Sequence, residues 1–265
     1  MKNKGKFDGR KTPIPQPCRL HAVGLSLAIL FAATATLFAS TAQEQMFAER
    51  ARAAYEHARA EYQSQTNNPV VAWEFARTCY DLTDRGTNKS QDAAIAQEGI
   101  NACQRALLLT NCAALHYYMG LNLGQLAQYE MLHGLHIVHE MEREWLAAAQ
   151  LDQRFDFAGP NRSLGLLYRD APGWPLSIGN RDKAEEFLQS AAVLAPDDPE
   201  NILNLAETYL KWGDTTNARH ELKILEDLWP KAQKNLAGER WAYDWYDWSR
   251  RRDAVRQKLN PAKGP

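Results

Sequence analysis

The stretch from Pro199 to Ala232 constrains the fold of this chain most, because its residue types fall at the spacing of two packed helices. Leu205 and Tyr209 lie four residues apart and therefore share one face of a first helix. Ala206 and Ala218 are small at the positions where two antiparallel helices approach closely. The stretch therefore predicts a helical hairpin.

Helix-ending residues set the period of this unit. Gly213 is expected to end the first helix, and Pro230 stands where the second helix is expected to stop. Pro196 precedes Pro230 by 34 residues, as a repeat of that length requires. The unit resembles a tetratricopeptide repeat, whose nine packing positions are filled here by Ile202, Leu205, Ala206, Tyr209, Gly213, Ala218, Leu222, Leu225 and Pro230.

Helical periodicity continues through the rest of the chain, and no stretch alternates as a strand would. Weaker versions of the repeat are expected at about 69–110, 113–150 and 158–198, with the sharp one at 199–232. Within the second of these, residues 121–151 fit either one longer helix or a broken pair. A helix over about 239–259 is expected to cap the last repeat. We therefore expect residues 43–260 to form an all-α, α-α superhelix of helical hairpins.

The first 42 residues have the order of an export signal. A basic segment precedes an apolar run over 22–39, and small residues follow at Ser40 and Ala42. Cleavage after this segment is expected, with retention as an N-terminal anchor as the alternative. Both alternatives place the remaining chain outside the cytoplasm, in the periplasm or attached to the envelope.

Removing residues 1–42 changes the charge of the chain. The remaining residues comprise 25 basic and 31 acidic side chains, a net charge of −6. A mildly acidic body without a basic stripe argues against nucleic acid as a partner and against tight binding to an anionic membrane. Cys79 and Cys103 are expected on the paired helices of one hairpin, where they form either a disulfide or buried apolar contacts.

Signatures of catalysis and of metal binding are missing. His133, His136 and His139 are spaced by three, which spreads the outer two by about 120° around a helix, so no metal site is expected. The sequence contains no GxSxG, GxGxxG or GxxxxGK[ST] motif. We therefore expect neither an enzyme nor a cofactor.

Two segments carry a family resemblance. Residues 159–168 read Gly-Pro-Asn-Arg-Ser-Leu-Gly-Leu-Leu-Tyr, and residues 171–179 read Ala-Pro-Gly-Trp-Pro-Leu-Ser-Ile-Gly. Together with the following repeat, over about 150–230, they resemble the T component of tetratricopeptide-associated TRAP transporters. The resemblance implies a periplasmic helical protein that partners the solute-binding protein of a tripartite, ATP-independent uptake system.

Five residues are candidates for binding a ligand or partner. Pro172 and Pro175 stiffen an insertion at 170–179 within a hairpin, and such an ordered loop is a common place for function. In a structural role, Trp174 fills a gap between hairpins and Arg162 satisfies loop carbonyls. In a binding role, Arg162 meets an anionic group and Trp174 or Tyr168 forms an apolar wall.

Trp241 and Trp245 likewise have either a structural role or a binding role. They either pack within the capping helix or, beside Arg250 to Arg252, form part of a protein interface. We therefore expect an exported, non-catalytic protein-binding adaptor, with a solute-binding protein as the candidate partner and homo-oligomers left open. The alternatives are a ligand-binding or ligand-channel component with a cavity near the 170–180 loop, and a general envelope scaffold.

Overall fold

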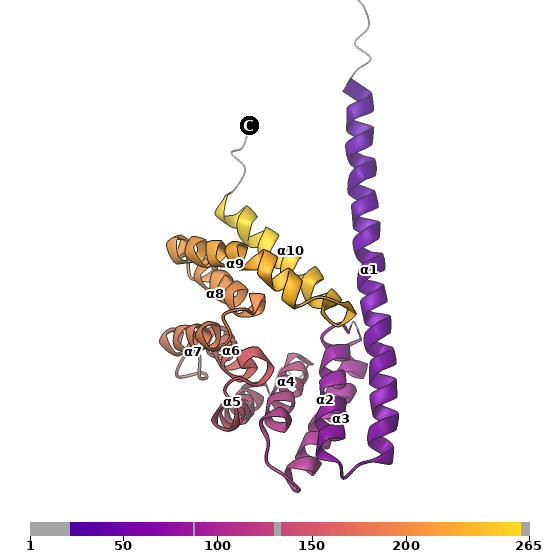
Figure 1. Cartoon of the computed structure of the whole chain (residues 1–265), viewed down its shortest axis with the longest axis vertical. Helices are drawn as coiled ribbons and strands as arrows, with labels where there is room; N and C mark the ends of the chain where they lie inside the picture. Colours follow the sequence, from indigo (N-terminus) through magenta and orange to yellow (C-terminus); the bar gives the residue numbers. More distant parts are fainter. Residues whose placement is uncertain (1–21, 87, 130–133, 261–265) are drawn as a thin grey trace, which may run out of the picture. The chain divides into compact units, whose positions relative to one another are not determined.

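The computed structural model describes residues 22–86, 88–129 and 134–260 (Figure 1). Within these ranges the chain forms ten α-helices, one short 3₁₀ helix and no strand, which confirms the all-α prediction. The chain divides into two compact units, residues 1–46 and 47–265, and helix α1 (Ala22–Ser64) runs across the boundary between them. Of the expected export signal, residues 1–21 lie outside the described part. A search of the described helices finds none with the length and apolar character required to cross a membrane.

The second unit is built from four consecutive helical hairpins. They are α2 (Pro69–Thr83) with α3 (Lys89–Leu107), α4 (Ala113–Tyr129) with α5 (Gly134–Leu151), α6 (Phe155–Asp170) with α7 (Arg181–Leu194), and α8 (Pro199–Lys211) with α9 (Thr215–Asn235). The first helix of each hairpin also packs on the first helix of the next hairpin. This succession of contacts is the expected α-α superhelix (Figure 1).

Side-chain caps explain where five of the eight helices in these hairpins begin. Asparagine or aspartate side chains accept a backbone N–H at the start of five helices, from Asn68, Asn88, Asn180, Asp198 and Asp214. Pro69 and Pro199 follow two of these caps, at the helical position where a missing N–H costs least. Gly213 has φ = +78°, a left-handed conformation that glycine adopts without strain, and it follows the end of α8 as expected.

The expectation that the second helix of the last hairpin stops at Pro230 is wrong. Helix α9 continues through Pro230 to Asn235. Pro230 cannot donate to the carbonyl of Glu226, but both residues are exposed, so water can replace the lost hydrogen bond. Continuing the helix also buries Ala232, which stabilises the extra turn.

The last hairpin is covered by the C-terminal segment, as expected for a capping helix. This segment consists of η1 (Glu239–Trp241) and α10 (Ala242–Leu259), and α10 packs on both α8 and α9. Trp248, Val255 and Leu259 on α10 are buried in the same core as Leu203 and Leu225 of the hairpin. Burial of these side chains replaces the contacts that a further repeat would make.

The segment also contacts the first helix of this unit. The ring of Tyr243 on α10 lies 5.3 Å from that of Phe47 on α1, in an edge-to-face arrangement. An ion pair of 3.0 Å joins Arg50 to Glu239. The residues at the start of the C-terminal segment therefore bridge from the last hairpin to the beginning of the unit.

The cysteines of the first hairpin are not joined. Cys79 on α2 and Cys103 on α3 are fully buried and free, and burial raises the pKa of both thiols. They therefore pack as small apolar side chains, the second of the two alternatives that the sequence allowed.

Candidate functional site

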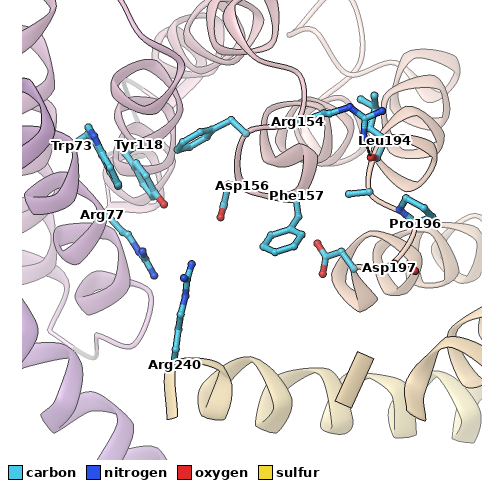
Figure 2. Close-up of a pocket in the computed structure, with 13 residues that line it drawn as sticks. Trp73, Arg77, Tyr118, Arg154, Asp156, Phe157, Leu194, Pro196, Asp197 and Arg240 are labelled. Carbon is cyan, nitrogen blue, oxygen red and sulfur yellow. Dashed lines mark hydrogen bonds between the residues drawn. The ribbon is translucent and has the colours of Figure 1, made fainter. Parts of the chain in front are cut away.

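A groove runs between the first helices of successive hairpins and the C-terminal segment. It consists of two adjoining cavities of about 580 and 530 Å³, which share lining residues from α2, α4, α6 and η1. We call the first the aromatic cavity; it is lined by Trp73, Arg77, Tyr118, residues 154–157 and 194–198, and Arg240 (Figure 2). We call the second the charged cavity; it is lined by carboxylates and arginines of α2, α6, α8 and α10.

A left-handed turn forms the wall between the two cavities. Asp156, Phe157 and Ala158 have φ values of +48°, +55° and +63°, a conformation that costs about 1–2 kcal/mol for each non-glycine residue. The turn bends the chain sharply at the start of α6, so that Phe157 lines both cavities. Left-handed turns of this kind persist only where surrounding contacts hold them.

Arg162 supplies those contacts. Its guanidinium donates to the carbonyl oxygens of Phe157 at 3.3 Å and Asp156 at 3.4 Å, and it pairs with Asp198 at 3.3 Å. Asn201 donates to the Phe157 carbonyl as well, at 2.9 Å. Arg162 therefore satisfies backbone carbonyls, as its structural role predicted, but these carbonyls belong to the turn at the start of α6 and not to the 170–180 loop. With its donors occupied, Arg162 is a support of the groove wall.

Trp174 does not fill a gap between hairpins, so that expectation is wrong. The side chain is 88% exposed, and Leu176 beside it is 71% exposed. The loop beneath them is ordered by backbone hydrogen bonds from Gly179 to Pro172 at 2.8 Å and from Asn180 to Tyr168 at 2.9 Å. A side chain at position 179 would lie 2.1 Å from the Ala171 carbonyl oxygen, so only glycine permits this closure. The rigid loop therefore holds Trp174 out in solvent.

The exposure of Trp174 leads to a prediction about stability. Trp174→Ala is expected to change the free energy of unfolding by less than about 0.5 kcal/mol, because the indole makes little buried contact. Ile178→Ala in the same loop is the matched control; Ile178 packs on the core, and its truncation is expected to cost about 1–2 kcal/mol. Urea denaturation of both variants measures the difference. A loss above 1 kcal/mol in Trp174→Ala would contradict the exposed position.

Tyr168 lies apart from both Arg162 and Trp174. Its ring is buried, stacks on Phe187 with centroids 5.6 Å apart, and has the Lys183 ammonium 4.7 Å above it. Its hydroxyl donates to Glu142 at 2.5 Å. These contacts join α6 to α5 and α7. The structure therefore does not bring Arg162, Tyr168 and Trp174 into one site.

Of the two candidate tryptophans in the C-terminal segment, one lies at the groove and the other packs in the interior. Trp241 lines the charged cavity and packs edge-to-face on Phe157 at 5.6 Å. Trp245 packs between Trp229 and Trp248, each 5.0 Å away, and its indole N–H donates to the Leu236 carbonyl at 2.6 Å. Trp245 is therefore a packing residue, whereas Trp241 belongs to the groove.

A half-buried arginine attaches α10 to α8. The guanidinium of Arg251 donates to Glu200 at 2.9 Å, to Glu207 at 2.7 Å and to Asn204 at 2.7 Å. The indole N–H of Trp248 donates to the same Glu200 carboxylate at 2.6 Å. Burial alone would raise the pKa of Glu200, but the charges of Arg251 and Arg162 outweigh it and lower the pKa to about 2. The carboxylate is therefore ionised throughout the physiological range.

The pKa of Asp244 on α10, unlike that of Glu200, is raised. Burial first, and then the negative charges of Glu200 and Asp81, raise its pKa to about 6, against the opposing effect of Arg85. The proton is thus held more tightly in the folded protein than at the ordinary pKa of 3.8. Ionisation of Asp244 therefore destabilises the fold fully above pH 6–7, and this penalty disappears as the pH falls through 6 towards 4.

Asp244→Asn is therefore expected to raise the free energy of unfolding by about 1–2 kcal/mol at pH 8 and by nothing at pH 4. This gain in the free energy of unfolding is smaller than the change in pKa from 3.8 to about 6 would give by itself, because Asp244 is only half-buried and solvent screens its charge. Asp247→Asn serves as the control; Asp247 pairs with Arg250 and Arg251, so its loss is expected to destabilise at pH 8. Denaturation at the two pH values tests both variants, and destabilisation by Asp244→Asn at pH 8 would refute the prediction.

The groove residues that sequence reasoning missed come from separate segments. Arg77 lies on α2, Tyr118 on α4, Asp156 at the start of α6 and Arg240 on η1. No local motif joins them; the available signal was the repeat frame, in which first helices of successive hairpins contribute to a common surface. Of the histidines considered for a metal, His133 lies outside the described residues, and His136 and His139 are exposed. Across the described residues no group of three potential ligands is placed to hold a metal.

Comparison with known proteins gives one partial match. A family model described as RMD1-3, Regulator of microtubule dynamics protein 1-3, matches residues 37–154. This chain is similar to that family over less than half of its 265 residues. The matched range includes the first two hairpins, and with them Arg77 and Tyr118 of the groove. No curated protein matches the chain.

Proposed function

We propose that this chain is a non-catalytic protein-binding adaptor that holds a segment of its partner in the groove. The observation that carries the proposal is the composition of the groove lining, to which the first helices of all four hairpins and the C-terminal segment contribute. Cavities of about 530 and 580 Å³ are within the range in which proteins enclose ligands or side chains. A superhelix that lines such a groove is suited to recognition along an extended segment.

The chemistry of the lining supports binding without catalysis. Asp198 pairs with Arg162 and caps α8, and Glu200 is held by Arg251. The described lining of the two cavities contains neither histidine nor cysteine. The carboxylates of Asp198 and Glu200 are therefore engaged in holding the groove together.

The partner and the compartment are proposed from the sequence. The basic, apolar and small residues of 1–42 favour export, and the segment 150–230 resembles the T component of TRAP transporters. A periplasmic solute-binding protein is therefore the proposed partner. The family-model match at 37–154 favours a different class, a protein connected with the regulation of microtubule dynamics.

Affinity purification of the tagged full-length chain from the host's envelope, followed by mass spectrometry, tests the proposal. Recovery of a solute-binding protein by the wild type, and its loss in the charged-cavity variant Trp241→Ala, is the expected result. Trp245→Ala is not a suitable control because it disturbs packing, whereas Trp174→Ala leaves the groove intact and should retain the partner. Retention of the partner by Trp241→Ala would place binding outside the groove.

A second candidate is a component that binds a small ligand, and the volume of the aromatic cavity, about 580 Å³, favours it. The sequence suggested such a cavity near the 170–180 loop, but neither of the two cavities is lined by residues of that loop. A general envelope scaffold with unrelated partners is the third candidate. Purification that recovers unrelated envelope proteins reproducibly would favour the scaffold over the transporter adaptor.

A further inference from the structure

The carboxylates that line the aromatic cavity are neutralised by cations that do not line it. Asp156 and Asp198 pair with Arg162, at 3.7 and 3.3 Å. Asp197 pairs with Lys231 on α9 at 2.7 Å. Each carboxylate of the lining therefore has a cationic partner outside the cavity, and Asp156 and Asp198 share one.

The arginines of the same cavity are paired less completely with carboxylates. Arg77 forms an ion pair with Asp81 on the same helix, at 3.7 Å. Arg154 donates to a neutral acceptor, the Leu194 carbonyl, at 2.6 Å, and Arg240 lies over the Trp241 ring at 5.2 Å. Three guanidinium groups thus line the cavity while its carboxylates are engaged elsewhere. Arg154 and Arg240 are therefore the two guanidinium groups of the lining that have no described carboxylate partner.

The guanidinium groups of Arg77 and Arg240 point toward the same part of the cavity. Figure 2 shows Arg77 of α2 and Arg240 of η1 extending toward each other across the cavity. Like charges in this arrangement repel, and an anion between them relieves the repulsion and accepts a hydrogen bond from each side. A carboxylate has the shape and the acceptors that two guanidinium groups require.

Aromatic rings form the adjacent wall. Trp73 and Tyr118 are stacked with centroids 5.8 Å apart and an interplanar angle of 7°. Phe155 meets Tyr118 edge-to-face at 6.1 Å, and the ring of Phe157 is partly exposed to the cavity (Figure 2). An apolar group next to the anion would therefore be removed from water by these rings.

We propose that the aromatic cavity binds an acidic peptide segment of the partner. A side-chain carboxylate lies between Arg77 and Arg240, and a neighbouring aromatic or large aliphatic side chain packs against Tyr118 and Phe157. The proposal rests on the proposed function, because it names the chemistry of the segment that the groove holds. At about 580 Å³ and open to solvent, the cavity accommodates a few side chains of an extended segment.

Calorimetry with the full-length chain and blocked synthetic peptides tests this inference. The probe is acetyl-Gly-Glu-Phe-Glu-Phe-Gly-amide, compared with the peptide that has Gln in place of both Glu residues. The Glu peptide is expected to bind at least 10-fold more tightly, and its affinity should fall as NaCl rises from 50 to 500 mM. Phenylacetate is the second probe, because it combines a carboxylate and an aromatic ring without a peptide backbone. If phenylacetate binds as tightly as the Glu peptide, the proposal is overturned in favour of a small organic acid.

Single substitutions test whether the Glu peptide binds in the aromatic cavity. Arg240→Gln and Arg77→Gln are each expected to weaken the Glu peptide at least 10-fold and to leave the Gln peptide unchanged. Arg240 is exposed, so its variant should keep the wild-type circular dichroism and melting. Arg52→Gln, at an exposed position on α1, is the matched control and should bind as the wild type does.

The outcomes separate this inference from the proposed function. Equal affinity for the Glu and Gln peptides, or wild-type binding by Arg240→Gln, would overturn the acidic-segment proposal even if the chain captures a protein partner through Trp241. Tight, Arg240-dependent binding of the Glu peptide supports the proposal. If the full-length chain then captures no protein, the adaptor function fails while the acid-binding cavity stands.

Discussion

Ala206→Asp is expected to unfold the last hairpin and to abolish the cooperative melting of the wild type. Ala206 on α8 is fully buried, in the same core as Ala218 of α9. The substituted carboxylate would enter this apolar contact without a partner, at a cost above about 4 kcal/mol. That is a large part of the 5–15 kcal/mol by which native domains are stable. Because α10 packs on the same hairpin, its attachment should be lost as well.

Thermal melting followed by circular dichroism, together with urea denaturation, measures this effect. Ala54→Asp is the matched control, since Ala54 lies on the exposed side of α1 and tolerates a charge in contact with water. The control is expected to remain within about 0.5 kcal/mol of the wild type. Melting of Ala206→Asp at the wild-type temperature would mean that the α8–α9 contact is not packed as described.

Arg251→Met is expected to have the second largest effect, a loss of about 3 kcal/mol in the free energy of unfolding. The substitution leaves Glu200 and Glu207 without the cation that both of them contact. Breaking a buried ion pair by removing one partner leaves an uncompensated charge, which costs about 3–5 kcal/mol. The lower end applies here because the Arg251 side chain is 21% exposed.

Its neighbour provides the control. Arg250 is largely exposed and pairs with Asp247 alone, so Arg250→Met is expected to cost less than about 1 kcal/mol. Removing the stranded charge in the double variant Arg251→Met, Glu200→Gln should recover part of the loss. Urea denaturation of the four proteins measures these differences. Equal stability of the Arg250 and Arg251 variants would show that the network does not hold α10.

The architecture was accessible from the sequence because its determinants are local. Side chains four residues apart, such as Leu205 and Tyr209, define a helix face without knowledge of the rest of the chain. Gly213 marks the end of α8 through its own backbone conformation. A repeat frame then converts local hairpins into a superhelix, and the structure confirms the all-α superhelix that this reasoning predicted.

Local reasoning failed where solvent exposure decided the outcome. Pro230 was expected to stop a helix, but its position on the exposed face lets α9 continue. Filling a gap between hairpins was one of the two roles predicted for Trp174, yet the loop turns its side chain outward. Which face of an element meets water depends on its neighbours in space, and no pattern within these segments contains that information.

The candidate site was only partly predictable for the same reason. Arg162 and Trp241 were identified from the sequence, and both lie at the groove. The role of Arg162, however, depends on a left-handed turn that the residue types around it do not predict. Arg77 and Arg240 are separated by more than half of the chain and meet because η1 and α10 fold back over the first helices.

The sequence by itself therefore determined the helices, their pairing into hairpins and the presence of a capping helix, since these follow from interactions between residues close along the chain. The tertiary structure alone decided where the groove lies, which charged side chains line it, and which of these form ion pairs with residues outside the aromatic cavity. Those properties depend on distances between segments far apart in sequence, and such distances follow from the packing of the whole superhelix.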